Sequence, residues 1–423
     1  MNASEQSITE TQKALLARYS EVRNHSVRLC EPLATEDYVV QPVSDVSPPK
    51  WHLAHTTWFF EELLLTTQSP AYERFNNGFA TLFNSYYKAA GEHWLQSERG
   101  QLSRPTVAEV MAYREHVDSA LITLLNTQAL PSNALSHLEI GLHHEQQHQE
   151  LLLMDIKYIL GANPFAPVYA TDKPQQIHTG TDQPEKSNWH TVPQGLTEIG
   201  HCGQEFGFDN ESPRHTTYLQ GAEICSSLVS NGQFLEFIQA GGYQRPEFWL
   251  SMGWEWLNEN TVNHPLYWVH DTDNDTWEEF TLYGKNALEH DAPVSHVSYF
   301  EAQAFAAWAQ ARLPTEQELE QFLGQHAHTE TVSDKGRMHP WDCNASADQL
   351  WCWTSSAYAP YPGFKAYEGM LEEYNGKFMC NQYVLRGGCV ATPPGHYRPS
   401  YRNFYLPHQR WMFSGIRLAK DIQ

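Results

Sequence analysis

The hydrophobic pattern of the chain changes near residue 165, and this change constrains the fold more than any other feature. Up to about residue 160, apolar residues recur at the three- and four-residue spacing of amphipathic helices. Beyond about residue 190, the chain is rich in Gly, Trp and Tyr and its apolar runs are short. A chain of 423 residues is also too long for one ordinary core. We therefore expect a helical domain over residues 1–165, a linker over 166–190 and an irregular α+β domain over 191–423.

The helical domain is predicted to be a four-helix bundle, because its four periodic segments are joined by long and short connections. Ser103 and Pro105 have the residue types of an N-cap and a first-turn proline, so the third helix is placed after them. The expected helices cover residues 9–24, 51–66, 107–125 and 134–160. In the second domain we expect an opening strand at 195–200 and helices over 230–240 and 298–311.

The chain is strongly acidic, which limits the partners it can bind. It has 27 Lys and Arg against 50 Asp and Glu, a formal net charge of −23. Such a surface repels phosphate backbones and anionic lipids, so we expect neither nucleic acid nor a membrane as a partner. No apolar run reaches the roughly 18 residues that a membrane helix needs, and the first residues lack an apolar signal segment. We therefore expect a cytoplasmic protein, whose seven scattered cysteines form no CxxC pair and are reduced.

The strongest chemical signal is a histidine pair in the predicted fourth helix. His144 and His148 are four residues apart, so one helix face presents both imidazoles side by side. One helix cannot surround an ion, and the candidate third ligand is His55 in the predicted second helix. Three imidazoles without a carboxylate leave three positions open on an octahedral ion, which suits a redox metal that binds substrate and dioxygen together. The sequence therefore predicts a metal site at these three histidines.

Two other interpretations of the histidine pair stay open at this point. Histidines at this spacing also occur as hydrogen-bonded helix residues without a metal. Residues 144–148 match the HExxH pattern of zinc proteases, with Glu145 as the general base. Residues 149–154, however, lack the x-x-G-x-x-H continuation of one large protease branch, and the segment after residue 160 offers no second helix with a Glu ligand.

Several motifs occur together along nearly the whole chain. They are WHLAH at 51–55, NSYY at 84–87, HEQQHQE at 144–150, LRGG at 385–388, TPPGH at 392–396, YRPSYRNF at 397–404 and FSGIRL at 413–418. In this combination the chain resembles the sulfoxide synthases of ergothioneine biosynthesis (EgtB type). The resemblance implies an N-terminal DinB-like four-helix bundle, followed by a domain similar to formylglycine-generating enzyme and C-type lectins. It also implies a site between the two domains, with the second domain contributing substrate contacts.

The resemblance implies an oxidoreductase with a specific chemistry. His55, His144 and His148 match the iron(II) triad of the family. The implied substrates are hercynine, dioxygen and cysteine or a cysteine-type thiol, which is joined to C2 of the hercynine imidazole to leave a sulfoxide. A selenoneine synthase and an ovothiol-type synthase on the same scaffold are alternatives. A DinB-like hydrolase or thiol transferase with zinc at the histidines, and a non-catalytic lectin-like binding module, are further ones.

The resemblance also implies roles for residues outside the triad. Tyr86 or Tyr87 is expected to donate a proton or hydrogen atom near the metal, and Gln147 to hydrogen-bond the substrate imidazole. Asn403 and Phe404 are expected near the trimethylammonium group, which an aromatic face attracts. Packing alone is the competing explanation for the two tyrosines and for Phe404. A carboxylate of the thiol calls for an arginine clamp, and the candidates are Arg99, Arg104, Arg398, Arg402 and Arg410.

Each of these arginines has a structural ion pair as its competing role. Tyr405 stands where the branch of the family that uses γ-glutamylcysteine would carry Asp. This departure, together with the Tyr86-Tyr87 pair, favours free cysteine as the thiol donor.

Overall fold

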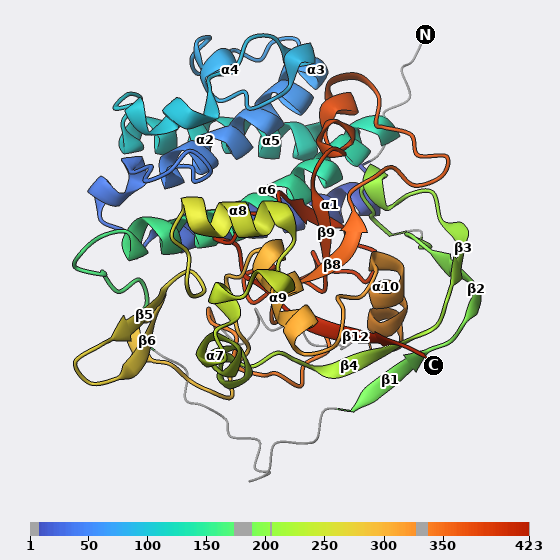
Figure 1. The fold of residues 1–423 in the computed structure, drawn as a ribbon. Helices are drawn as coiled ribbons and strands as arrows, with labels where there is room; N and C mark the ends of the chain where they lie inside the picture. The colour runs from blue at the N-terminus through green and yellow to red at the C-terminus, as the bar shows by residue number, and fades with distance from the viewer. Residues whose placement is uncertain (1–7, 173–187, 204, 327–336, 423) are drawn as a thin grey trace. The chain divides into compact units, whose positions relative to one another are not determined.

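The structure is a computed structural model that describes residues 8–172, 188–203, 205–326 and 337–422. The chain forms two compact units (Figure 1). The first contains the residues up to Ala162 together with a short later segment, Tyr367–Tyr374, and the second contains Asn163–Ala366 and Asn375 onward. Most of the predicted linker, residues 173–187, lies outside the described residues. Its described first part belongs to the second unit, where Tyr169 is buried and its backbone amide donates to the Leu282 carbonyl at 3.0 Å.

Four long helices form the first unit, as the periodicity predicts. They are α1 (Glu10–Cys30), α2 (Pro49–Phe60), α5 (Val107–Thr127) and α6 (Ser132–Gly161). Helix α2 continues through a π-helical turn, Glu61–Leu65, into α3 (Thr66–Gln68), and α4 (Phe79–Leu82) lies in the long connection to α5. Helix α6 packs against α1 and α2, and α2 also packs against α5. The histidine motifs therefore lie on two neighbouring helices of one bundle.

The start of α5 differs from the sequence-based expectation. Its N-cap is Thr106, whose hydroxyl accepts from the Glu109 amide at 3.2 Å while the Glu109 carboxylate accepts from the Thr106 amide at 2.7 Å. This capping box satisfies donors at both ends of the first turn. Ser103 is therefore not the cap, and Pro105 precedes the helix instead of lying in its first turn.

A segment far along the sequence completes the first unit. Residues Tyr367–Tyr374, which contain the 3-10 turn Gly369–Glu373, were expected in the second domain but belong with the helices. The backbone amide of Lys88 donates to the Glu373 carboxylate at 2.5 Å, which ties this segment to the loop that carries Tyr86 and Tyr87. Periodicity cannot reveal that a segment belongs to the other domain, because this membership depends on contacts between residues hundreds of positions apart.

In its described residues, the second unit is an α+β structure with four small sheets. Their strand orders are β1-β4-β12, β10-β9-β8-β11, β2-β3 and β5-β6-β7. Pairing is antiparallel except between β11 and β8. The strands are β1 (Trp189–Val192), β2 (Gly195–Ile199), β3 (His215–Leu219), β4 (Ala222–Leu228), β5 (Trp268–Asp271), β6 (Thr276–Thr281), β7 (Gly284–Ala287), β8 (Trp351–Ala357), β9 (Tyr383–Arg386), β10 (Asn403–Tyr405), β11 (Ser414–Gly415) and β12 (Arg417–Asp421).

Helices of the second unit partly follow the predicted pattern. The expected strand at 195–200 is β2, and the two expected helices are α7 (Asn231–Gln239) and α9 (Tyr299–Trp308), capped by Ser230 and Ser298. Two further helices, α8 (Ser251–Glu259) and α10 (Glu316–Gln325), were not predicted. The core of this unit is built from large aromatic and arginine side chains, among them Trp351, Trp353, Arg386 and Arg402.

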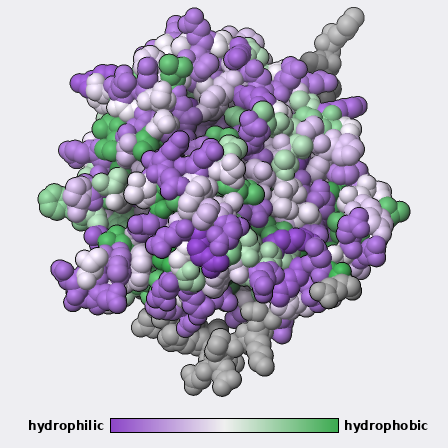
Figure 2. Space-filling model, viewed as in Figure 1, coloured by the Kyte–Doolittle hydropathy of each residue, from purple (hydrophilic) through white to green (hydrophobic). Residues whose placement is uncertain are grey.

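The face shown in Figure 2 is mostly hydrophilic, with hydrophobic residues scattered singly over it. None of the helices in the described ranges is long and apolar enough to cross a bilayer. All seven cysteines are free thiols, as their spacing suggested.

Candidate metal centre

The three predicted ligand histidines converge in the first unit. His55 comes from α2, and His144 and His148 come from successive turns of α6. One ring nitrogen of each lies within 4.8 Å of those of the other two. The centroid distances between rings are 5.0 Å for His55–His144, 4.8 Å for His55–His148 and 4.6 Å for His144–His148. Three imidazoles at these separations can coordinate a single ion.

His55 is held in one orientation. Its ring lies between Trp51, stacked at 4.6 Å and 9°, and Trp58, at 5.5 Å and 16°. Its Nδ1 lies 2.6 Å from the Phe83 carbonyl oxygen. Because a carbonyl can only accept, Nδ1 carries the proton and the lone pair of Nε2 remains for a metal.

The other two histidines have different surroundings. His148 Nδ1 lies 2.9 Å from Nδ1 of His52, a buried histidine that precedes His55 by one helical turn. The His144 ring stacks on Phe59 at 4.1 Å, and its buried Nδ1 has no hydrogen-bond partner among the described residues. A buried nitrogen without a partner is costly, and a bound metal or substrate would satisfy it. The donor set therefore fits a metal.

The electrostatics also favour metal binding. Burial lowers the pKa of all three histidines well below the ordinary value, and each lies close enough to another histidine to lower the pKa further. The imidazoles are therefore neutral at neutral pH, which is the form that binds metals. Imidazole nitrogen suits zinc and iron alike, so the ligands alone do not choose between these metals.

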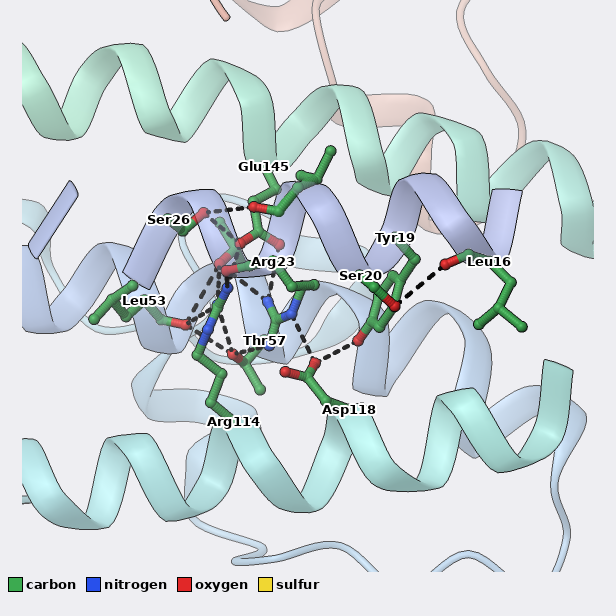
Figure 3. Close-up of polar contacts among 12 residues, drawn as sticks. Leu16, Tyr19, Ser20, Arg23, Ser26, Leu53, Thr57, Arg114, Asp118 and Glu145 are labelled. Carbon is green, nitrogen blue, oxygen red and sulfur yellow. Dashed lines mark hydrogen bonds and ion pairs between the residues drawn. The ribbon is translucent and has the colours of Figure 1, made fainter. Parts of the chain in front are cut away.

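Glu145 has a structural role that excludes it as a general base. Its Oε2 accepts from Arg23 Nη1 at 2.9 Å, and its Oε1 accepts from Arg114 Nη2 at 2.6 Å and from the Ser26 hydroxyl at 2.6 Å (Figure 3). Burial alone would raise the pKa of Glu145, but the two guanidinium groups outweigh it and hold the pKa below its ordinary value. Both oxygens are occupied and the side chain is fully buried, so the zinc-protease interpretation is wrong.

The two adjacent tyrosines have different neighbours. Asn84 fixes their loop, because its amide nitrogen donates to the Tyr87 carbonyl at 3.0 Å and its oxygen accepts from the Tyr87 amide at 3.1 Å. The buried Tyr87 ring lies 5.7 Å from Trp58, which stacks on His55, and 6.0 Å from Phe59, which stacks on His144. The Tyr86 hydroxyl donates to the Gln96 side chain.

A third tyrosine near the triad was missed by the sequence analysis. Tyr374, in the segment that joins the first unit from later in the chain, has its ring centroid 5.8 Å from that of His144. Its hydroxyl donates to Oε1 of Gln147 at 2.5 Å. The contact joins residues 227 positions apart, and no local pattern in the sequence signals it.

Comparisons with known proteins agree with this fold. Residues 18–152 match the model of the DinB superfamily, and residues 175–349 and 325–422 match that of the sulfatase-modifying factor enzyme 1-like domain. Hercynine oxygenase from Mycobacterium tuberculosis is 30% identical over 408 residues, spanning 89% of this chain and 92% of that protein. The chain belongs to the hercynine oxygenase family. The expected fold class, a DinB-like helical domain followed by a domain like formylglycine-generating enzyme, is confirmed.

Two further hercynine oxygenases support the same assignment. That of Mycolicibacterium smegmatis is 30% identical over 423 residues, covering 89% of this chain and 92% of the relative. That of Mycolicibacterium thermoresistibile is 28% identical over 451 residues, covering 97% of this chain and 95% of the relative. An oxygenase is an oxidoreductase, so the expected enzyme class is also confirmed at the level of the family.

Among the arginine candidates in this hercynine oxygenase homologue, Arg99 has unused donors near the triad. It is buried, its Nη1 donates to the Ser47 hydroxyl at 2.8 Å, and its Nε and Nη2 have no partner with hydrogen-bond geometry among the described residues. Its Cζ lies 3.3 Å from the centroid of Trp51, on which His55 stacks, and its charge interacts with the Tyr86 hydroxyl. Burial lowers the pKa of Arg99 to about 10, so the group stays charged at neutral pH.

The other arginine candidates have protein partners or lie on the surface. Arg402 is fully buried and donates to both oxygens of Glu316, at 2.9 and 3.0 Å, and to two backbone carbonyls. Arg398 Nε donates to Glu211 Oε2 at 2.8 Å, and Arg410 Nη1 donates to the His264 carbonyl at 2.8 Å. Arg104 is exposed. The structure therefore gives no support to a substrate-clamp role for these four arginines.

Asn403 and Phe404 lie on β10 of the second unit. Phe404 stacks on Tyr358 at 4.0 Å and 10°, and Phe378 lies 5.7 Å from it. The Phe404 backbone amide donates to the Asn403 side-chain oxygen at 2.9 Å. These contacts explain how the two side chains are held, and their role in binding a trimethylammonium group stays a prediction.

Proposed function

We propose that this protein is a non-haem iron(II)- and O2-dependent sulfoxide synthase that joins cysteine, or a cysteine-type thiol, to C2 of the hercynine imidazole. The product is hercynylcysteine sulfoxide, a step of ergothioneine biosynthesis. One thiol, one imidazole C–H and one O2 give the C–S bond, the sulfoxide oxygen and one water. The observation that carries the proposal is a triad of neutral imidazoles without a carboxylate, in a member of the hercynine oxygenase family.

His55, His144 and His148 would hold the iron. Bound there, iron(II) supplies a centre that takes up thiolate and dioxygen, a chemistry for which zinc lacks the redox capacity. The residues around the triad orient the substrates. The Tyr374 hydroxyl fixes which side of the Gln147 carboxamide is the acceptor, and so orients the amide that we propose contacts the hercynine ring.

The proposal is tested by the product formed. The anaerobic protein is loaded with iron(II), mixed with hercynine and cysteine, and exposed to air, and the product mass and oxygen consumption are recorded. γ-Glutamylcysteine or a selenium donor in place of cysteine, and histidine in place of hercynine, are the comparison arms. Oxygen uptake that requires none of the imidazole substrates would contradict the proposal. A product only from the selenium or histidine arm would replace it with the corresponding alternative.

Arg99 is proposed to bind the carboxylate of the thiol, because a buried guanidinium with two unused donors calls for an anion. We expect Arg99→Gln to raise KM for cysteine roughly 10- to 100-fold, the equivalent of about 1.5–3 kcal/mol for a hydrogen bond to a charged group. Cysteamine, which lacks the carboxylate, should bind both proteins equally poorly. The matched control is the exposed Arg104→Gln, which should leave both KM values unchanged. An equal loss for cysteine and cysteamine would rule out this role.

Tyr87 is proposed as the proton donor that directs the reaction towards C–S bond formation, because its ring adjoins Trp58 and Phe59, which stack on metal ligands. We expect Tyr87→Phe to lower the rate of sulfoxide formation by roughly 100-fold or more, the scale of general acid catalysis. Oxygen should then be consumed in oxidising the thiol alone. Product ratios measured for Tyr87→Phe, Tyr86→Phe and Tyr374→Phe assign the role, and an unchanged ratio in Tyr87→Phe would remove it from Tyr87.

A further inference from the structure

We propose that His52 and Asp155 are positioning residues that fix the tautomer of the metal ligand His148, and thereby set the affinity of the triad for its metal. This inference rests on the proposed function only in that the triad binds a metal. None of the sequence motifs assigned a role to His52 or Asp155, although His52 lies in the same motif as His55.

The three side chains form a continuous hydrogen-bonded chain inside the first unit. His148 Nδ1 lies 2.9 Å from His52 Nδ1, and His52 Nε2 lies 3.0 Å from Asp155 Oδ2. His52 and Asp155 are each only 3% exposed. The same carboxylate oxygen accepts from the backbone amide of Ser47 at 2.8 Å, which anchors the far end of the chain. Water is therefore largely excluded from the path between Asp155 and the ligand.

The positions of the protons in this hydrogen-bonded series follow from the Asp155 carboxylate at one end of it. The Asp155 carboxylate can only accept, so His52 Nε2 carries a hydrogen. In neutral His52, Nδ1 is then the acceptor, and the Nδ1–H of His148 must donate to it. That tautomer leaves the lone pair on Nε2 of His148, where a metal can bind. The opposite tautomer would place a hydrogen on Nε2 of His148 and block coordination.

The three ligands differ in what holds their rings in place. We refer to the hydrogen-bonded chain His148–His52–Asp155 as the relay. His55 is hydrogen-bonded by a backbone carbonyl, His148 by a histidine that in turn contacts a carboxylate, and the His144 ring is held by stacking on Phe59. Within the described residues, His148 is therefore the ligand whose hydrogen-bond partner is a side chain that substitution can remove. Partners of this kind fix the orientation of a ligand and raise its basicity, and their loss usually costs about 10- to 100-fold in metal affinity.

The relay is tested by titrating the metal-free full-length protein with cobalt(II), whose absorption spectrum reports coordination without any turnover. We expect His52→Phe and Asp155→Asn to weaken cobalt binding by about 10- to 100-fold. His52→Asn should restore most of the affinity, because its amide oxygen can accept in place of His52 Nδ1. The matched control is His143→Phe, since His143 is equally buried at 3% exposure but contacts Arg18, 2.8 Å from its Nε2.

A spectroscopic measurement separates this role from a general effect on folding. In the proton NMR spectrum of the cobalt-loaded protein, the Nδ1–H of His148 should give a strongly shifted, exchangeable resonance that His143→Phe retains and His52→Phe loses. Wild-type affinity in both His52→Phe and Asp155→Asn would overturn the relay, and so would His52→Asn binding no better than His52→Phe. If wild-type protein itself fails to bind cobalt, the metal site falls, and with it the proposed function. If cobalt binds as expected but no hercynine-dependent oxygen uptake occurs, only the proposed function fails.

Discussion

Replacing His144 by alanine will weaken binding of a divalent metal by more than about 100-fold, and hercynine-dependent oxygen uptake will fall below detection. The expected loss exceeds the roughly 10- to 100-fold that removal of an outer partner of a ligand costs, because a ligand itself disappears. His55 and His148 would remain, and two imidazoles leave a divalent ion too weakly held at micromolar concentration. Cobalt(II) titration and oxygen consumption measure the two effects independently.

The adjacent histidine provides the control for this experiment. His143 is buried on the same helix, but its ring lies against Arg18 instead of the triad. His143→Ala should therefore leave metal stoichiometry and affinity unchanged. Tight binding of one metal ion by His144→Ala would contradict the site, and loss of binding in both variants would point to a damaged helix.

The metal centre was predictable from the sequence because most of its geometry is local. The four-residue spacing of His144 and His148 places both on one face of any helix, and the apolar residues around them turn that face inward. Predicting His55 as the third ligand required one further assumption, that the second and fourth helices of the bundle pack against each other. Helices α2 and α6 do pack together, so the assumption was correct.

The environment of the triad was not predictable in the same way. Tyr374 reaches Gln147 from 227 residues away, and Asp155 reaches His52 across 103 residues. Each pairing depends on how separate elements pack, and neither residue belongs to a periodic or motif-like pattern. The exchange of residues 367–374 into the helical unit is the largest such effect, because it moves a site residue from one predicted domain to the other.

The arginines illustrate a different limit of sequence analysis. Arg398 and Arg402 lie in one of the motifs on which the resemblance to the family was based, yet their guanidinium groups donate to Glu211 and Glu316. Arg99 has the same residue type, but two of its nitrogens have no hydrogen-bond partner in the part of the chain that the structure describes. A motif shows that an arginine belongs to the fold, while burial and hydrogen bonding show whether it has donors left for a substrate.

Glu145→Gln will lower the free energy of unfolding by about 3–5 kcal/mol, the usual cost of removing one partner from a buried ion pair. Gln has nearly the same shape as Glu, so the change removes charge while preserving packing. Arg23 and Arg114 are both 2% exposed. Arg114 would then remain buried without its ion-pair partner, and Arg23 would keep only Asp118, 2.7 Å from its Nε (Figure 3). If Glu145 were instead an accessible general base of a protease, the same substitution would abolish activity without lowering the free energy of unfolding. Chemical denaturation at neutral pH measures the difference.

The pH dependence of the stability lost in Glu145→Gln shows whether the buried charge is its cause. The pKa of Glu145 lies below its ordinary value in the folded protein, so the ionised side chain stabilises the fold above its unfolded pKa, and this stabilisation is lost as the pH falls through the folded pKa. The difference between wild type and Glu145→Gln should therefore be constant above about pH 5 and shrink in more acidic solution. Glu139→Gln, on the same helix but 38% exposed and 3.9 Å from Arg18, should change stability by less than about 1 kcal/mol at any pH. A deficit in Glu145→Gln that persists undiminished in acid would mean that packing, and not the buried charge, holds α6 and its two histidines in place.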